Sequence, residues 1–113
     1  MNEFGITNEV FEQILIVFTQ IPEIKKVVLF GSRARGDYKK TSDIDLAIWF
    51  EGEDKKMLVI RMLDELRCIL KFDVVAMNEI TNELLKNNIN KDGRVIYARR
   101  IRSGTTEKVA LNF

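Results

Sequence analysis

The sequence contains no histidine, one cysteine and one proline among its 113 residues. Without histidine, the chain cannot build a Ser-His or Cys-His nucleophile, an HExxH zinc site or a histidine general base. The single cysteine, Cys68, cannot form a disulfide within the chain, which is typical of proteins from a reducing compartment such as the cytoplasm. Cys68 lies in an apolar helical pattern, so we interpret it as a small buried hydrophobic residue.

Long hydrophobic runs and an excess of one charge are also missing. No apolar run approaches the length of a transmembrane helix, and the first residues lack the pattern of a signal peptide, so no membrane partner is expected. The net charge of +1 gives no argument for direct nucleic-acid binding. A chain of 113 residues with 46% hydrophobic and 31% charged residues has the size and composition of one folded domain. We expect one cytoplasmic domain over 1–113, in which about 101–113 could form a flexible tail.

Apolar residues recur with helical and strand periods in alternating order along the chain. Helices are predicted from Thr7 or Asn8 to about 21, from about 55 to 70, and from Asn78 or Thr81 to about 88. A short helical turn is predicted at 32–35, and strands are predicted at 27–30, 43–50, 71–77 and 94–97. This alternation predicts an α/β (α+β) fold with a small mixed β-sheet and flanking helices.

Three aspartates occupy strand positions where a carboxylate does little for a sheet. Asp43 and Asp45 begin one predicted strand two residues apart, so their side chains point the same way. Asp73 lies inside another apolar strand, where an unpaired carboxylate is costly. If the strands are neighbours, the three carboxylates converge and suit Mg²⁺ together with substrate phosphates. The alternative is that the three acids share no site. Asp43 would then be a turn residue, Asp45 an exposed strand residue and Asp73 the partner of a lysine.

A Gly31-Ser32 turn follows the first predicted strand. Glycine lets backbone N–H groups approach a phosphate, and the Ser32 hydroxyl can donate to a phosphate oxygen. Arg33 could neutralise phosphate charge, the alternative being a solvated or ion-paired side chain, which is our interpretation of Arg35. Neither a Walker A loop nor a GxGxxG dinucleotide pattern is present.

The run GSRARGDYKKTSDIDLAIWF resembles the minimal nucleotidyltransferase (MNT) family of the DNA polymerase β-type nucleotidyltransferase superfamily. The signature is Gly31-Ser32, ten residues, and then Asp43-x-Asp45. The family's third acid, on a later strand, matches Asp73. The resemblance covers about 27–75, and no motif position departs from the pattern of active members.

The resemblance implies a nucleotidyltransferase fold in which Asp43, Asp45 and Asp73 hold two Mg²⁺ ions, while Gly31 and Ser32 bind the triphosphate. We add Arg33 to the predicted nucleotide-binding residues because it adjoins Ser32. It implies transfer of AMP from ATP to a hydroxyl, with Asp73 helping to activate the acceptor. Family members form the antitoxin half of HEPN/MNT toxin–antitoxin pairs. The implied partner is therefore a cognate HEPN toxin, with a tyrosine as acceptor in a type VII-like system. Nucleic acid would be involved only indirectly through the toxin. The sequence leaves the oligomeric state open, and both a homo-oligomer and a hetero-oligomer are compatible with it.

Two other functions remain open. One is AMP transfer to a small hydroxylated acceptor of the antibiotic type, and the other is a non-catalytic antitoxin that masks the toxin by binding. The short chain leaves few residues for an acceptor-binding domain, which favours an acceptor presented by a partner protein. The first helix and the apolar C-terminal end are candidate contact surfaces, although most apolar residues of that helix are expected to cover the sheet.

Overall fold

The computed structural model describes residues 2–102 and 105–108, and the side chains of residues 2–99. The elements in chain order are α1 (Asn8–Thr19), β1 (Ile24–Phe30), α2 (Ser32–Arg35), β2 (Ile44–Phe50), α3 (Lys56–Asp64), β3 (Phe72–Ala76), the 3₁₀ helix η1 (Met77–Glu79), α4 (Glu83–Asp92), β4 (Arg94–Arg102) and β5 (Thr105–Lys108). The strands form one sheet in the order β3-β2-β1-β4-β5. Only the β2–β3 pair is parallel among these described strands, so the predicted mixed sheet with flanking helices is confirmed.

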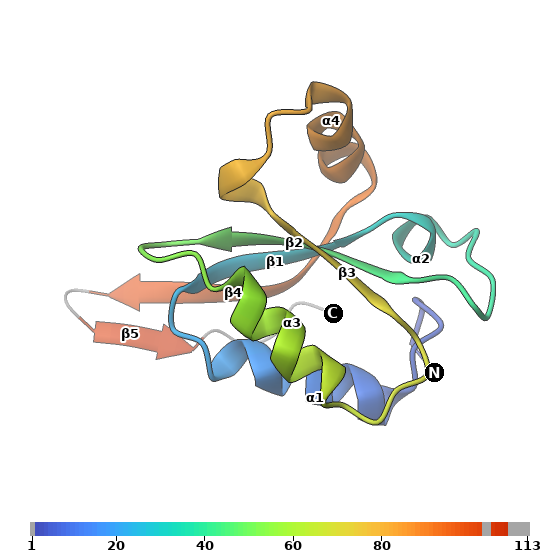
Figure 1. Cartoon of the computed structure of the whole chain (residues 1–113), viewed down its shortest axis with the longest axis horizontal. Helices are drawn as coiled ribbons and strands as arrows, with labels where there is room; N and C mark the ends of the chain where they lie inside the picture. The colour runs from blue at the N-terminus through green and yellow to red at the C-terminus, as the bar shows by residue number, and fades with distance from the viewer. Residues whose placement is uncertain (1, 103–104, 109–113) are drawn as a thin grey trace.

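Helices α1 and α3 cover one face of the sheet, here called the lower face, and α4 covers the other, the upper face (Figure 1). The Thr7 side chain caps α1 by accepting a hydrogen bond from the Val10 amide, as predicted. The buried face of α1 then packs under the sheet through Phe11, Ile14, Leu15, Val17 and Phe18. The first helix thus covers the sheet with these residues. Within residues 2–102 and 105–108, none of the helices has the length and apolar character that crossing a bilayer requires.

The central strands β1 and β2 are largely buried on both faces, which the apolar run at 27–30 predicts for β1. On β2, Ile44, Leu46 and Ile48 join the lower core, whereas Ala47 joins the upper cluster with Trp49 packed against it. Asp45 has the same strand parity as Ala47 and lies at the start of the upper face. The alternation of β2 therefore directs its apolar side chains into the main core and Asp45 away from it.

Two predicted helix boundaries are wrong. α3 ends at Asp64 and not near residue 70, because the chain must turn back so that Phe72 pairs level with Ile44 on the parallel strand. α4 begins after Asn82, whose side chain accepts a hydrogen bond from the Leu85 amide, and it extends to Asp92. Asn78 is no helix cap: its side chain hydrogen-bonds both backbone groups of Phe50 at the end of β2.

The C-terminal part of the sheet is longer than the sequence predicts. β4 extends to Arg102, and β5 pairs with it in antiparallel register with Thr105 opposite Arg102. The flexible tail considered for about 101–113 stays a prediction, and the strand pairing adds 101–102 and 105–108 to the sheet. Residues 103–104 and 109–113, which include the apolar end considered as a contact surface, lie outside the described residues.

Candidate functional site

The register of the sheet brings the three predicted acids to one end of it. Asp45 pairs directly with Asp73 across the parallel β2–β3 ladder. On its other side, Asp45 pairs with Phe30, the last residue of β1, so Gly31 follows beside it. Asp43 immediately precedes β2 and is exposed, as is Asp73 on the edge strand. Residues that are distant in the sequence therefore lie together at one end of the sheet, on its upper face.

The Asp45 carboxyl is the electrostatic centre of this edge. It is half-buried, and its pKa is raised from 3.8 to about 6 by burial first, then by repulsion from Asp73 and Asp43. Arg35 acts in the opposite direction and lowers the pKa. Asp73 and Asp43 thus both act on Asp45, in addition to the larger effect of burial.

A divalent cation would relieve this repulsion. In the described part of the chain, no three acidic or cysteine side chains form a ready-made metal cage. The donor set still fits Mg²⁺, because Mg²⁺ binds through a few carboxylates and completes its shell with waters and substrate phosphates. Asp43, Asp45 and Asp73 are therefore the residues that could hold it, with the nucleotide supplying further oxygens.

Gly31 must be glycine for two reasons. Its φ of 76° lies in the left-handed region. A Cβ at this position would also collide with Oδ2 of Asp45. Ser32 follows as the first residue of α2, and no hydrogen bond to its hydroxyl is found among the described residues. The Ser32 hydroxyl is therefore free to donate to a ligand beside the carboxylates.

Arg33 was predicted to contact phosphate, and the structure places it elsewhere. The residue is 2% exposed, and the Tyr38 ring lies 5.1 Å from its guanidinium carbon. Its guanidinium donates hydrogen bonds of 2.9–3.4 Å to the carbonyls of Phe4, Gly5, Lys39, Lys40 and Ser42. These carbonyls engage its donors and bury it, so the guanidinium is not available to a phosphate. The solvated alternative is also wrong, and Arg33 is a buried link between the N-terminal segment and the loop that precedes Asp43.

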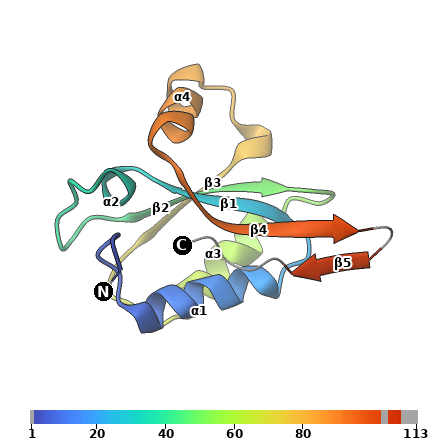
Figure 2. The same cartoon turned by 180° about the vertical axis from the view of Figure 1, so that it is seen from behind.

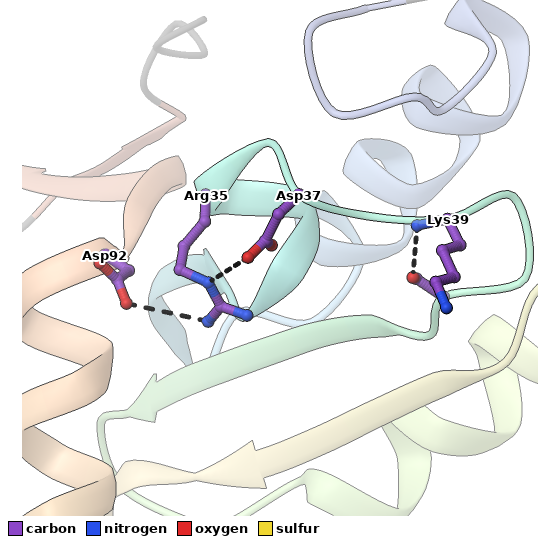
Figure 3. A network of polar contacts seen from close by, with 5 residues as sticks. Arg35, Asp37, Lys39 and Asp92 are labelled. Atoms are coloured by element: carbon purple, nitrogen blue, oxygen red, sulfur yellow. Dashed lines mark hydrogen bonds and ion pairs between the residues drawn. The ribbon is translucent and has the colours of Figure 1, made fainter.

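Arg35 is ion-paired, as the sequence interpretation expected. Its Nε lies 3.3 Å from Oδ2 of Asp37, and its Nη1 lies 3.8 Å from Oδ2 of Asp92 at the end of α4 (Figure 3). Residues two apart on a helix point to nearly opposite sides, so when Arg33 is buried, Arg35 faces the open side. That spacing was the available signal. Arg35 is therefore the cation that offsets the charge of Asp45.

Comparison with known proteins agrees with this geometry. The family described as Polymerase beta, Nucleotidyltransferase matches residues 12–102. The chain is 40% identical over 83 residues to the candidate protein adenylyltransferase MJ0604 of Methanocaldococcus jannaschii, covering 66% of this chain and 79% of that protein. It is 34% identical over 102 residues to the protein adenylyltransferase MntA of Aphanizomenon flos-aquae, covering 79% of this chain and 67% of MntA.

Two solved complexes contain chains of the same fold. One is a toxin–antitoxin crystallised with AMP-PNP, similar with a TM-score of 0.65 and 21% identity over 78% of this chain and 73% of that chain. The other is a tri-AMPylated Shewanella oneidensis HEPN toxin in complex with its MNT antitoxin, with a TM-score of 0.59 and 18% identity over 80% of this chain and 71% of that chain. The family match spans every element that carries a candidate residue. The chain therefore belongs to the polymerase beta nucleotidyltransferase family and is a nucleotidyltransferase.

Proposed function

We propose that this chain is an Mg²⁺-dependent adenylyltransferase that transfers AMP from ATP to a tyrosine hydroxyl of a cognate HEPN toxin and thereby acts as its antitoxin. The observation that carries the proposal is the meeting of Gly31-Ser32 with Asp43, Asp45 and Asp73 at one sheet edge. A phosphate-binding turn beside three carboxylates is suited to nucleotidyl transfer. In this proposal the reaction takes place in the cytoplasm, where ATP is available.

The chain's own residues support each part of the transfer. Gly31 and Ser32 bind the triphosphate. Asp43, Asp45 and Asp73 would hold two Mg²⁺ ions, which would neutralise charge that develops on the phosphate oxygens. The acceptor oxygen forms a bond to the α-phosphorus while the bond to the bridging oxygen breaks and pyrophosphate leaves. Asp73 takes the acceptor proton, since it lies exposed on the edge strand, where an acceptor from another chain can approach.

The choice of acceptor is supported by the relatives. The sequence relatives described above are named for protein adenylyltransferase activity, one of them as a candidate. The structural neighbours include a complex of an AMPylated HEPN toxin with its MNT antitoxin. Both facts favour a protein acceptor over a small molecule.

The direct test is incubation with Mg²⁺, ATP labelled at the α-phosphate and the product of the neighbouring gene. We expect the label to transfer to that protein, while ATP labelled at the γ-phosphate transfers none. Asp45→Asn should abolish labelling, and Asp64→Asn, which changes an exposed acid at the end of α3, should retain it. Label on no protein with any nucleoside triphosphate would contradict the proposal.

A second readout separates catalysis from masking. If Asp45→Asn still neutralises the toxin fully in cells that express both proteins, the chain acts by binding and not by AMP transfer. We expect growth arrest with this variant and rescue with Asp64→Asn. Label on a small hydroxylated compound, and none on protein, would support the antibiotic-type alternative.

A further inference from the structure

An apolar groove lies at the same end of the molecule as the three acids. It forms where the N-terminal segment, the loop before β2 and the link between α3 and β3 come together (Figures 1 and 2). Its volume is about 620 Å³. Its wall includes Ile6, Val10, Tyr38, Ile69 and Leu70. We call it the end groove.

The end groove leads to the candidate site. A smaller adjoining hollow of about 260 Å³ shares Lys40, Ile69 and Leu70 with it and reaches Asp43. Gly31, Ser32 and Asp45 line neither hollow. The groove therefore approaches the site at Asp43, through the adjoining hollow, and not at the nucleotide-binding turn.

The charges around the end groove are of one sign. Arg33, Lys40 and Arg67 line it, and its described lining includes no carboxylate. Lys71 adds a further cation in the adjoining hollow, where Asp43 is the acid that marks the reaction site. No ion pair involving Lys40, Arg67 or Lys71 is found among the described side chains. Such a rim is complementary to an acidic occupant.

Ile69 lines the groove but does not pack against the core of the protein. It is 100% exposed, whereas the neighbouring Leu66 and Leu70 pack against the core. An exposed isoleucine beside an apolar hollow is typical of a contact surface. Met57 on α3 is 70% exposed but lines neither hollow, so it offers a matched comparison.

We infer that the end groove docks the acceptor-bearing segment of the partner protein, a short acidic stretch with an apolar side chain as its anchor. The anchor enters the hollow beside Ile69, the acidic residues face Arg67 and Lys40, and the acceptor hydroxyl reaches Asp43 and Asp73. This inference rests on the proposed function, since it names how the same site receives its acceptor.

Affinity for the product of the neighbouring gene, measured by titration calorimetry with the full chain, tests the inference. Ile69→Glu should weaken binding at least about tenfold, because it places a charge where the apolar anchor docks. Arg67→Glu should weaken it by about threefold to tenfold. Met57→Glu should bind as the wild type does, and all three variants should keep wild-type affinity for ATP with Mg²⁺.

The outcomes separate this inference from the proposed function. If the wild type labels the partner and Ile69→Glu binds and labels it equally well, the inference is wrong and the function stands. If the wild type binds without transferring AMP and Ile69→Glu loses binding, the groove stands and the function fails. Loss of ATP affinity in Ile69→Glu would assign the groove to the nucleotide, and loss of self-association would assign it to a second copy; either result overturns the inference.

Discussion

The two faces of the sheet differ in what covers them and in what they carry. Among the described residues, the lower face contributes to a cluster of 21 buried residues sealed by α1 and α3. The upper face is covered by α4 (Figure 2) and contributes to a cluster of 4 buried residues, and its end carries the half-buried Asp45. Most of the hydrophobic stabilisation therefore lies below the sheet.

Because the lower core supplies most of the stabilisation, the protein can fold with repelling carboxylates on the upper face. The repelling carboxylates around Asp45 lower stability in the absence of a cation, and the lower core offsets that cost. The link between the faces is α2, which has Arg33 buried on one side and Arg35 open on the other.

Arg33→Met should have the largest effect on stability. The variant keeps an apolar stem but leaves five carbonyls without their donor, so we expect a loss of about 3–5 kcal/mol in the free energy of unfolding. Arg35→Met removes only exposed ion pairs and should cost less than about 1 kcal/mol. Urea unfolding measures both, and equal costs would contradict the buried-link role of Arg33.

Core truncations compare the two faces directly. Ile48→Ala in the lower core should cost about 3–4 kcal/mol, whereas Ile89→Ala in the upper cluster should cost about 2 kcal/mol. The difference arises because fewer buried neighbours surround Ile89, and because alanine favours the α4 helix. Denaturant midpoints with unchanged slopes check the order. The reverse order would mean that the upper cluster supports the fold more than its size indicates.

Two glycine substitutions separate backbone strain from contact with the site. Gly31 and Gly52 both have φ in the left-handed region, so alanine should cost about 1–2 kcal/mol at either position. At Gly52 nothing lies within 4 Å of an added Cβ, whereas at Gly31 it meets Asp45. Gly31→Ala should therefore lower the rate of nucleotidyl transfer at least about tenfold, and Gly52→Ala should leave it unchanged. Equal rates in the two variants would show that Asp45 adjusts freely.

The sequence predicts the faces well because they follow from strand alternation. Ile44, Leu46 and Ile48 alternate with Asp45 and Ala47, and the period of 2 assigns each to its face. The end of α3 and the existence of β5 were not predictable in this way. Both depend on pairing between strands, and a local pattern does not contain that information.

At the candidate site, too, a local sequence pattern predicts only what does not depend on contacts between distant segments. The spacing of Gly31-Ser32 and the acids is local and was sufficient to find them. The buried role of Arg33 could not be predicted from local spacing, because Arg33 is buried against the carbonyl of Phe4, 29 residues away in the chain. The i and i+2 spacing indicates that one arginine is inside and one outside, but only the tertiary contact decides which.

Asp45→Asn should have the smallest effect on stability. It tests how much the Asp45 charge on the upper face lowers the free energy of unfolding. The folded protein keeps the Asp45 proton up to about pH 6, while the unfolded chain loses it near pH 3.8. Between these values the folded state binds more protons, so the free energy of unfolding falls as pH rises and stays lower above pH 6. Because solvent reaches this half-buried carboxylate, we expect a penalty of only about 1 kcal/mol.

Urea unfolding from pH 4 to pH 8 in the presence of EDTA measures this penalty. Asp45→Asn should be more stable than the wild type at pH 8 and equal to it near pH 4, where the wild-type carboxyl is mostly protonated. Asp64→Asn, at the end of α3, should follow the wild-type profile. Added Mg²⁺ should stabilise the wild type at pH 8, because a cation replaces repulsion among the carboxylates with attraction. The difference in free energy of unfolding between Asp45→Asn and the wild type should then become smaller. An unchanged difference in free energy of unfolding in Mg²⁺ would mean that Asp45 does not bind the ion. The Asp45 carboxylate would then need a role other than metal binding.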